Sequence, residues 1–199
     1  MKTAKIISIV GHPIFHPTWM MIILLLTGIT QFNHSNDWKL LGITFTITCL
    51  IPAIVILLMK RWHLINSIEM EERDDRPAPL FIMVLFLYTT LTLFNKINDF
   101  KIYSFYLTSV IVVTALAFII SFFWKISLHT LGWGNLVACL FIMTKASLQT
   151  YFYYFIASIL LAGIVAAARL KLKSHDSTQI YAGFAMGFAT VIILYSFLA

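Results

Sequence analysis

The chain has 199 residues, of which 60% are hydrophobic and only 11% are charged, and its mean hydropathy is +0.90. A soluble domain of this length cannot bury so much apolar surface, so the composition excludes an ordinary soluble protein and indicates a bilayer as the solvent. The net charge of +6 is spread over short loops. That distribution fits anionic lipid head groups or phosphates and argues against a nucleic acid partner. We expect a single integral membrane domain over residues 1–199.

About seven apolar runs are long enough to cross the roughly 30 Å hydrocarbon layer. Each must satisfy its own backbone hydrogen bonds in lipid, so we predict an all-α, polytopic bundle of six or seven transmembrane helices. The first run continues without a small-residue cleavage pattern, which predicts a retained segment rather than a signal peptide. The runs lie near residues 14–33, 40–59, 79–95, 102–124, 130–145, 151–168 and 178–198, the fifth being the shortest.

Three polar clusters, at residues 60–77, 124–130 and 168–179, are separated from one another by even numbers of predicted crossings. They should therefore lie on the same face of the membrane. Arginine offers paired donors to phosphate oxygens, one histidine can attack phosphorus, and a second can protonate the leaving oxygen. Such a set predicts phosphoryl chemistry that needs no metal. Its members are Arg73, Arg76, Lys125, Ser127, His129, Arg169, Lys171, Lys173 and His175.

The order and spacing of these residues resemble the type 2 phosphatidic acid phosphatases, the superfamily that includes the vanadium haloperoxidases. Its three signatures are Lys-x6-Arg-Pro, Pro-Ser-Gly-His and Ser-Arg-x5-His-x3-Asp. Arg76 and the following proline resemble the end of the first, Ser127 and His129 resemble the second, and Arg169 and His175 resemble the third. The resemblance covers roughly residues 60–190 and is closest to a divergent membrane branch that we associate with Bacteroidetes-type bacteria.

The resemblance implies a phosphatase-like helical core over residues 60–190 and hydrolysis of a lipid phosphate monoester or diphosphate, with no metal or cofactor. His175 would be the nucleophile that forms a phosphohistidine, and His129 would be the general acid. Arg76 and Arg169 would hold the phosphate, and Ser127 would donate a further hydrogen bond. Phosphatidate, phosphatidylglycerol phosphate, an isoprenyl phosphate or diphosphate, and lipid A all remain open as the phosphorylated lipid substrate.

Two signature positions depart from the family pattern. Glu69 stands where the first signature has lysine, and Gln179 stands where the third has aspartate; the second signature also lacks its proline and glycine. Gln179 can accept the Nδ1 hydrogen bond of His175 and orient the ring, but it brings no negative charge. Arg73 or Lys125 could replace the missing lysine. A catalytically degenerate member that binds anionic lipid or serves a membrane complex is therefore the alternative.

The sequence GHPIFHP places His12 and His16 four residues apart, a spacing that allows a haem or metal site and hence a small transporter or haem protein. The proline after each histidine disfavours a helical conformation for it. We therefore favour a shaped entry into the first helix over a ligand pair.

Two further patterns each allow two interpretations. Gly183 and Gly187 form GxxxG in the last helix, which favours internal helix packing over dimerisation. The segment EMEERDDRP is either a solvated loop with internal ion pairs or a contact for a divalent cation or a head group. Its acids are Glu69, Glu71, Glu72, Asp74 and Asp75.

The distribution of cations predicts orientation. Of the 14 Lys and Arg residues, ten fall on the predicted site face and four, Lys39, Lys96, Lys101 and Lys145, on the other. The positive-inside rule then places the site in the cytoplasm. Without Arg73, Arg76, Lys125 and Arg169 the counts become six and four, so the bias depends on the proposed site residues themselves. We expect a multi-pass protein of a bacterial inner membrane.

Overall fold

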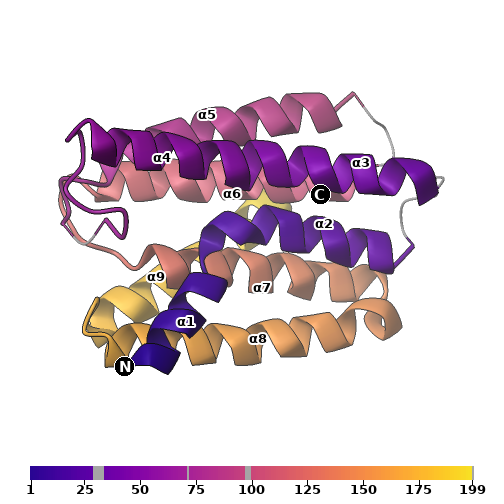
Figure 1. The fold of residues 1–199 in the computed structure, drawn as a ribbon. Coiled ribbons are helices and arrows are strands. Elements are labelled where there is room, and N and C mark those ends of the chain that lie inside the picture. The colour runs from indigo at the N-terminus through magenta and orange to yellow at the C-terminus, as the bar shows by residue number, and fades with distance from the viewer. Residues whose placement is uncertain (29–33, 71, 97–99, 199) are drawn as a thin grey trace. The chain divides into compact units, whose positions relative to one another are not determined.

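The computed structural model describes residues 1–28, 34–70, 72–96 and 100–198 (Figure 1). Within these residues the regular structure is helical, with no strand. The elements are α1 (Lys2–Val10), η1 (Pro13–Phe15), α2 (His16–Leu26), α3 (His34–Phe45), η2 (Thr46–Leu50), α4 (Ile51–Arg61), α5 (Pro77–Phe94), α6 (Lys101–Ile120), α7 (Leu128–Ala146), α8 (Leu148–Lys171) and α9 (Ser177–Leu198).

Six helical stretches in the described residues are long and apolar enough to cross a membrane, as expected of a multi-pass membrane protein. The run expected at 130–145 does form a helix, α7, but it is outside this set. Its sequence LHTLGWGNLVACLFIMTKA includes glycines and polar residues, and it is buried along most of its length. The six stretches are Lys2–Leu26, Trp38–Arg61, Pro77–Phe94, Lys101–Ile120, Leu148–Lys171 and Ser177–Leu198.

The first stretch differs most from the prediction, because it begins at Lys2 rather than near residue 14. It is also interrupted. His12 is extended, with φ −70° and ψ 133°, as expected of a residue before proline. His16, although it too precedes a proline, is helical, with φ −60° and ψ −39°, and α2 begins there. The first prolyl bond therefore interrupts the helix, whereas Pro17 lies in the first turn of α2, where no backbone N–H is required.

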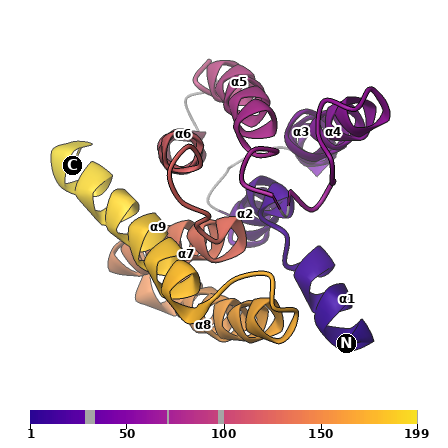
Figure 2. The same ribbon diagram turned by 90° about the vertical axis from the view of Figure 1, so that its left-hand side faces the viewer.

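The chain divides into two compact units, and the predicted phosphatase-like core contributes residues to both. Unit 1 comprises Met1–His16 and Lys125–Ala199, and unit 2 comprises Pro17–Trp124. In unit 1, α7 packs against both α8 and α9, and α1 packs against α8. Figure 1 shows α7 and α8 side by side, and Figure 2 shows α9 crossing them obliquely.

Glycines bring α7 and α9 into backbone contact. A Cβ atom on Gly187 would meet the Leu131 carbonyl oxygen and lie 2.9 Å from the Asn135 nitrogen. A Cβ on Gly183 would lie 2.8 Å from the Ser127 carbonyl oxygen. Small residues are the usual means by which membrane helices approach this closely. The predicted internal packing role of the GxxxG pair is confirmed.

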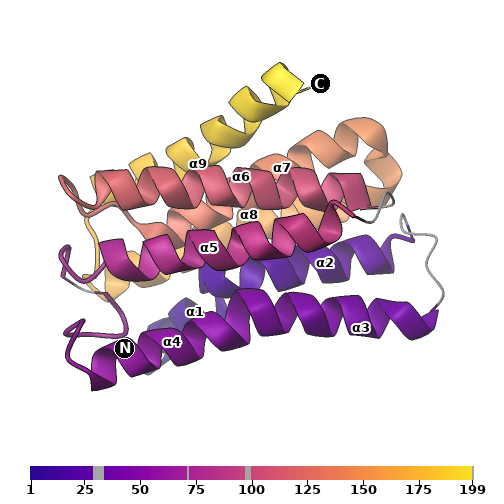
Figure 3. The ribbon, with the colours of Figure 1, turned by 90° about the horizontal axis from the view of Figure 1, so that it is seen from above.

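In unit 2, α5 packs against α6 on one side and against the rod formed by α3, η2 and α4 on the other (Figure 3). The rod contains a π-helical segment immediately before Pro52. Proline has no N–H to continue the α-helical ladder, which accounts for the widened turn at this point. Thr48 donates its hydroxyl proton to the Thr44 carbonyl 2.8 Å away, which satisfies a backbone acceptor inside the rod.

The close α7–α9 contact predicts a large difference between two Gly→Ala substitutions. Gly187→Ala should destabilise the protein by about 1–3 kcal/mol, because the new methyl group overpacks a backbone contact. Gly163→Ala, on α8, meets nothing within 4 Å and should be neutral or slightly stabilising. Thermal unfolding of both variants in detergent measures this. Equal melting temperatures would contradict the packing described here.

Candidate functional site

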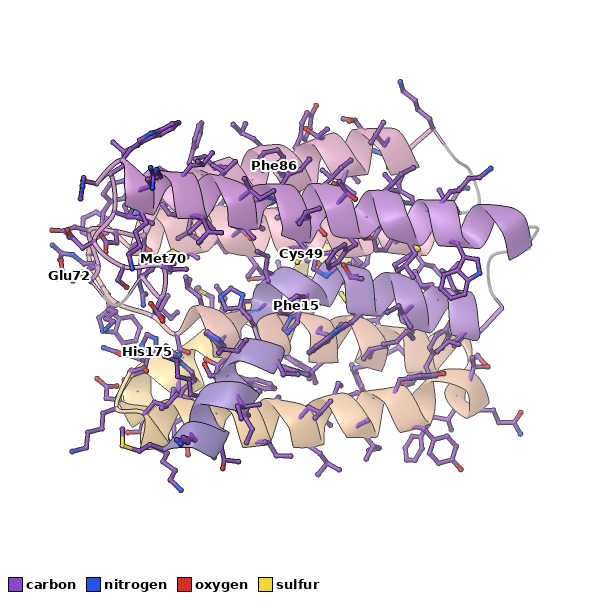
Figure 4. All side chains as sticks on the ribbon, in the orientation of Figure 1. Phe15, Cys49, Met70, Glu72, Phe86 and His175 are labelled. Carbon is purple, nitrogen blue, oxygen red and sulfur yellow. The ribbon has the colours of Figure 1, made fainter. Side chains whose placement is uncertain are left out.

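His175 is held against Gln179 at the start of α9. The His175 Nδ1 and Gln179 Oε1 atoms are 2.8 Å apart, and since an amide oxygen can only accept, Nδ1 donates. The Nε2 atom therefore carries the lone pair. Asp176 precedes the helix and accepts the Gln179 N–H at 2.8 Å, as an N-terminal cap does. Figure 4 labels His175 at this end of unit 1, where α8 gives way to α9.

Ser127 joins the second polar cluster to the third. Its N–H donates to the Gln179 carbonyl at 3.3 Å. Its side chain caps α7 by accepting the Thr130 N–H at 3.5 Å, and the residue is fully buried. A hydroxyl in this position keeps its own proton as a donor. The structure therefore brings residues 127 and 175–179 together, although about fifty residues separate them. Lys125 lies two residues before Ser127 and is half-buried.

Ser8 of α1 connects Arg169 to His129. The Arg169 Nη1 atom donates to Ser8 Oγ at 2.9 Å. His129 Nε2 lies 3.1 Å from the Ser8 carbonyl oxygen and 3.3 Å from Ser8 Oγ. Because a carbonyl only accepts, Nε2 carries the proton of the neutral ring. All three residues are buried. The two predicted phosphate-site residues are thus brought together through a serine of the N-terminal helix.

The surroundings of His129 disfavour a positive charge on its ring. It lies outside the six candidate membrane spans, at the start of α7. Burial lowers the pKa of His129 well below its usual value, and positive charge on His12 and on Arg169 lowers it further. The His12 ring packs edge-on against it, with the centroids 4.9 Å apart. A phosphate bound beside this ring would raise the pKa and favour the protonated form that a general acid requires.

The two N-terminal histidines have different surroundings. His12 contacts His129, and its Nδ1 accepts the Ile14 N–H at 3.2 Å. The His16 ring packs against Trp133, 4.8 Å between centroids. In the part of the chain that the structure describes, no three His, Cys, Asp or Glu side chains gather as a metal site requires. The contacts favour the interpretation of this segment as a shaped helix entry.

Hydrogen bonds to Asp75 hold the acidic loop of unit 2 closed. Its carboxylate accepts the backbone N–H of Asn66 at 2.9 Å and of Ser67 at 3.0 Å, and the residue is buried. Glu72 accepts from the Asn66 side chain at 3.1 Å. Two of the acids therefore close the loop on itself through hydrogen bonds, and the internal ion pair that the solvated-loop interpretation predicts is formed by Arg73 and Asp74. Glu69 is exposed, and Glu71 lies outside the described residues.

Two predicted phosphate ligands, Arg76 and Arg73, belong to this loop of unit 2. Arg76 is buried, and its Nε donates to the Met70 carbonyl at 3.2 Å. Arg73 is exposed and pairs with Asp74, with 3.3 Å between Nε and Oδ1. A contact of either arginine with the residues of unit 1 stays a prediction.

Sequence reasoning missed Ser8 and underrated His12. Ser8 lies in the apolar run KIISIV, 161 residues before Arg169, and a lone serine there carries no signal of a buried polar contact. From the sequence, His12 is predicted to be part of a shaped helix entry or a ligand partner of His16, and no contact between His12 and His129 is predicted. Its contact with His129 spans more than a hundred residues and needs the packed structure to be seen.

Comparison of the chain with family models, with curated proteins and with solved structures found no match.

Ser8 should matter for stability as well as for the site. Ser8→Ala removes the acceptor for Arg169 and leaves a buried guanidinium donor without it, which should cost about 1–3 kcal/mol. Ser196→Ala, an exposed serine of α9 that bonds only its own helix backbone at Ile193, is the matched control. Thermal unfolding in detergent compares the two. A Ser8→Ala protein as stable as the control would mean that the bridge contributes nothing.

Proposed function

We propose that the protein is a membrane-bound, phosphatidic-acid-phosphatase-like hydrolase of a lipid phosphate monoester or diphosphate. The observation that carries the proposal is the orientation of His175. Its Nδ1–H donates to Gln179 Oε1, so its Nε2 holds the lone pair needed to attack phosphorus. A histidine oriented in this way, six residues after a buried arginine, is the arrangement that the family resemblance implies.

In the proposed reaction Nε2 of His175 attacks phosphorus, and the bond from phosphorus to the lipid oxygen, or to the bridging oxygen of a diphosphate, breaks. The leaving oxygen takes a proton from the cationic form of His129, which becomes neutral. Water then attacks phosphorus and gives one proton back to His129, the P–N bond breaks and returns its electron pair to His175 Nε2, and inorganic phosphate leaves. Arg169 and Ser127 would stabilise charge on the phosphoryl oxygens, with Arg76, Arg73 and Lys125 as the remaining proposed ligands.

The neutral Gln179 limits the rate that this arrangement can reach. A carboxylate in that position would stabilise the positive charge that develops on His175. In a serine-protease triad, loss of the orienting carboxylate lowers kcat by about 10⁴-fold. We therefore expect slow turnover from the wild-type protein.

The alternative function is a catalytically degenerate protein that binds anionic lipid or serves a membrane complex. A specific observation favours it: Arg169 Nη1 and His129 Nε2 both face Ser8. In the proposed reaction these atoms would serve the phosphate and the leaving oxygen. Substrate would have to displace the Ser8 hydroxyl from Arg169, and the Ser8 hydroxyl and carbonyl from His129, before the two side chains could act.

The decisive measurement is phosphate release by the purified full-length protein in detergent from a panel of lipid phosphates and diphosphates. We expect slow release from wild type, none from His175→Ala, and faster release from Gln179→Asp, because a carboxylate stabilises the charged imidazole. His63→Asn is the control for the loss of a histidine. His63 is exposed and has φ 58°, a conformation that asparagine tolerates.

The variants separate the two functions. Release that disappears with His175→Ala but persists with His63→Asn supports the hydrolase and its nucleophile. If wild type releases no phosphate but Gln179→Asp does, the result supports the catalytically degenerate protein, whose site lacks only the carboxylate. If no folded variant releases phosphate, the hydrolase proposal is wrong.

We also propose that the site faces the cytoplasm of a bacterial inner membrane. With α7 counted as a crossing, the chain crosses seven times, and α9 leads its C-terminal end to the face opposite His175. Alkaline phosphatase fused to Ala199 should therefore be active, and a green fluorescent protein fused there should be dark. A fluorescent fusion with an inactive phosphatase would reverse the orientation or the number of crossings.

A further inference from the structure

The net charge of the chain lies in unit 1. By sequence, residues 17–124 hold seven Lys or Arg residues and seven Asp or Glu residues, so unit 2 has no formal net charge. Unit 1 has a single acid, Asp176, whose carboxylate caps α9. Its seven cations are Lys2, Lys5, Lys125, Lys145, Arg169, Lys171 and Lys173. The formal charge of +6 is therefore that of unit 1 alone.

The packing of α1 on α8 gathers most of these cations at one end. Ser8 bonds Arg169, and Gly11, one turn later, lies against Val165, one turn earlier on α8, so α1 runs in the opposite sense to α8 where the two helices cross. Lys5 and Lys2 precede Ser8 and therefore extend toward the C-terminal end of α8, beyond Arg169. Figure 1 shows the start of α1 at the same end of unit 1 as the end of α8, where α9 begins. Lys171 and Lys173 follow at that end. We call Lys2, Lys5, Lys171 and Lys173 the lysine end.

The lysine end lies where two candidate membrane spans begin or end, and head groups flank the hydrocarbon layer at such positions. All four lysines are exposed. Lys2 is the first residue of one candidate span and Lys171 the last residue of another. Exposed apolar side chains accompany them on the same helices, among them Ile6 and Ile9 of α1 and Ile164 of α8. Lysines at the edge of an apolar, exposed helix surface suit a membrane leaflet better than a soluble partner.

We propose that the lysine end binds the anionic head groups of phospholipids and enriches them around this end of unit 1. The proposal does not depend on the hydrolysis of any lipid. It requires an excess of positive charge within unit 1, where Asp176 is the one acid against seven cations. A phosphodiester such as phosphatidylglycerol has the required charge and is not a phosphate monoester.

The test uses the full-length protein purified in mixed micelles that contain equal amounts of phosphatidylglycerol and phosphatidylcholine. Mass spectrometry of the lipid retained by the washed protein gives the ratio of the two. We expect an excess of phosphatidylglycerol on wild type. Replacing all four lysines of the lysine end by glutamine should lower that excess by on the order of tenfold, because each lysine near an anionic surface adds to the attraction. High salt should weaken the wild-type excess as well.

The matched control removes the same charge from unit 2, with glutamine in place of Lys60, Arg61, Lys96 and Lys101, all exposed. The control should keep the excess. Equal losses from both quadruple variants would assign the effect to net charge and overturn the proposal. So would an unchanged ratio in the lysine-end variant, or no excess on wild type. Displacement of the lipid by millimolar inorganic phosphate would also overturn it, because the site would then bind a free anion.

Discussion

The backbone contact between α7 and α9 is the constraint on which the candidate site depends. In lipid the hydrophobic effect does not drive helices together, so close packing between small residues takes its place. Gly183 and Gly187 allow α9 to lie directly on the α7 backbone. That contact places the first turn of α9 beside the start of α7, where the Ser127 N–H reaches the Gln179 carbonyl. The two glycines have no reactive side chain, but their packing against α7 positions His175.

Ser8 of the N-terminal helix allows two interpretations of the site, as a catalytic centre or as a structural bridge. Ser8 satisfies Arg169 and His129 in the same small space where the proposed reaction needs a phosphate oxygen. A serine hydroxyl is a reasonable occupant in the absence of substrate, since it can accept from both groups and leave without breaking a covalent bond. It is equally suited to a purely structural bridge. The hydrolase and the structural bridge therefore use the same three residues, and they differ in whether a phosphate can displace Ser8.

Acidic residues play opposite parts in the two units. In unit 2, the carboxylates of Asp75 and Glu72 accept hydrogen bonds from Asn66 and close a short loop. These acids therefore stabilise the local structure of the loop that also contains the predicted phosphate ligands Arg73 and Arg76. In unit 1 the one acid, Asp176, caps a helix, and seven cations outnumber it. Charge counts along the sequence could not separate these cases, because a carboxylate that accepts backbone N–H groups looks the same in sequence as one that is free in water.

The sequence by itself determined the class of protein, because hydropathy over runs of about twenty residues is a local property that lipid enforces on every helix. It also placed most helices to within a few residues, predicted the internal packing of the glycine pair, and anticipated that Gln179 could orient His175 across one helical turn. Only the tertiary structure decided the bridge from Ser8 to Arg169 and His129. Those contacts join residues more than a hundred positions apart, and no local pattern specifies which buried polar groups will meet once the helices pack.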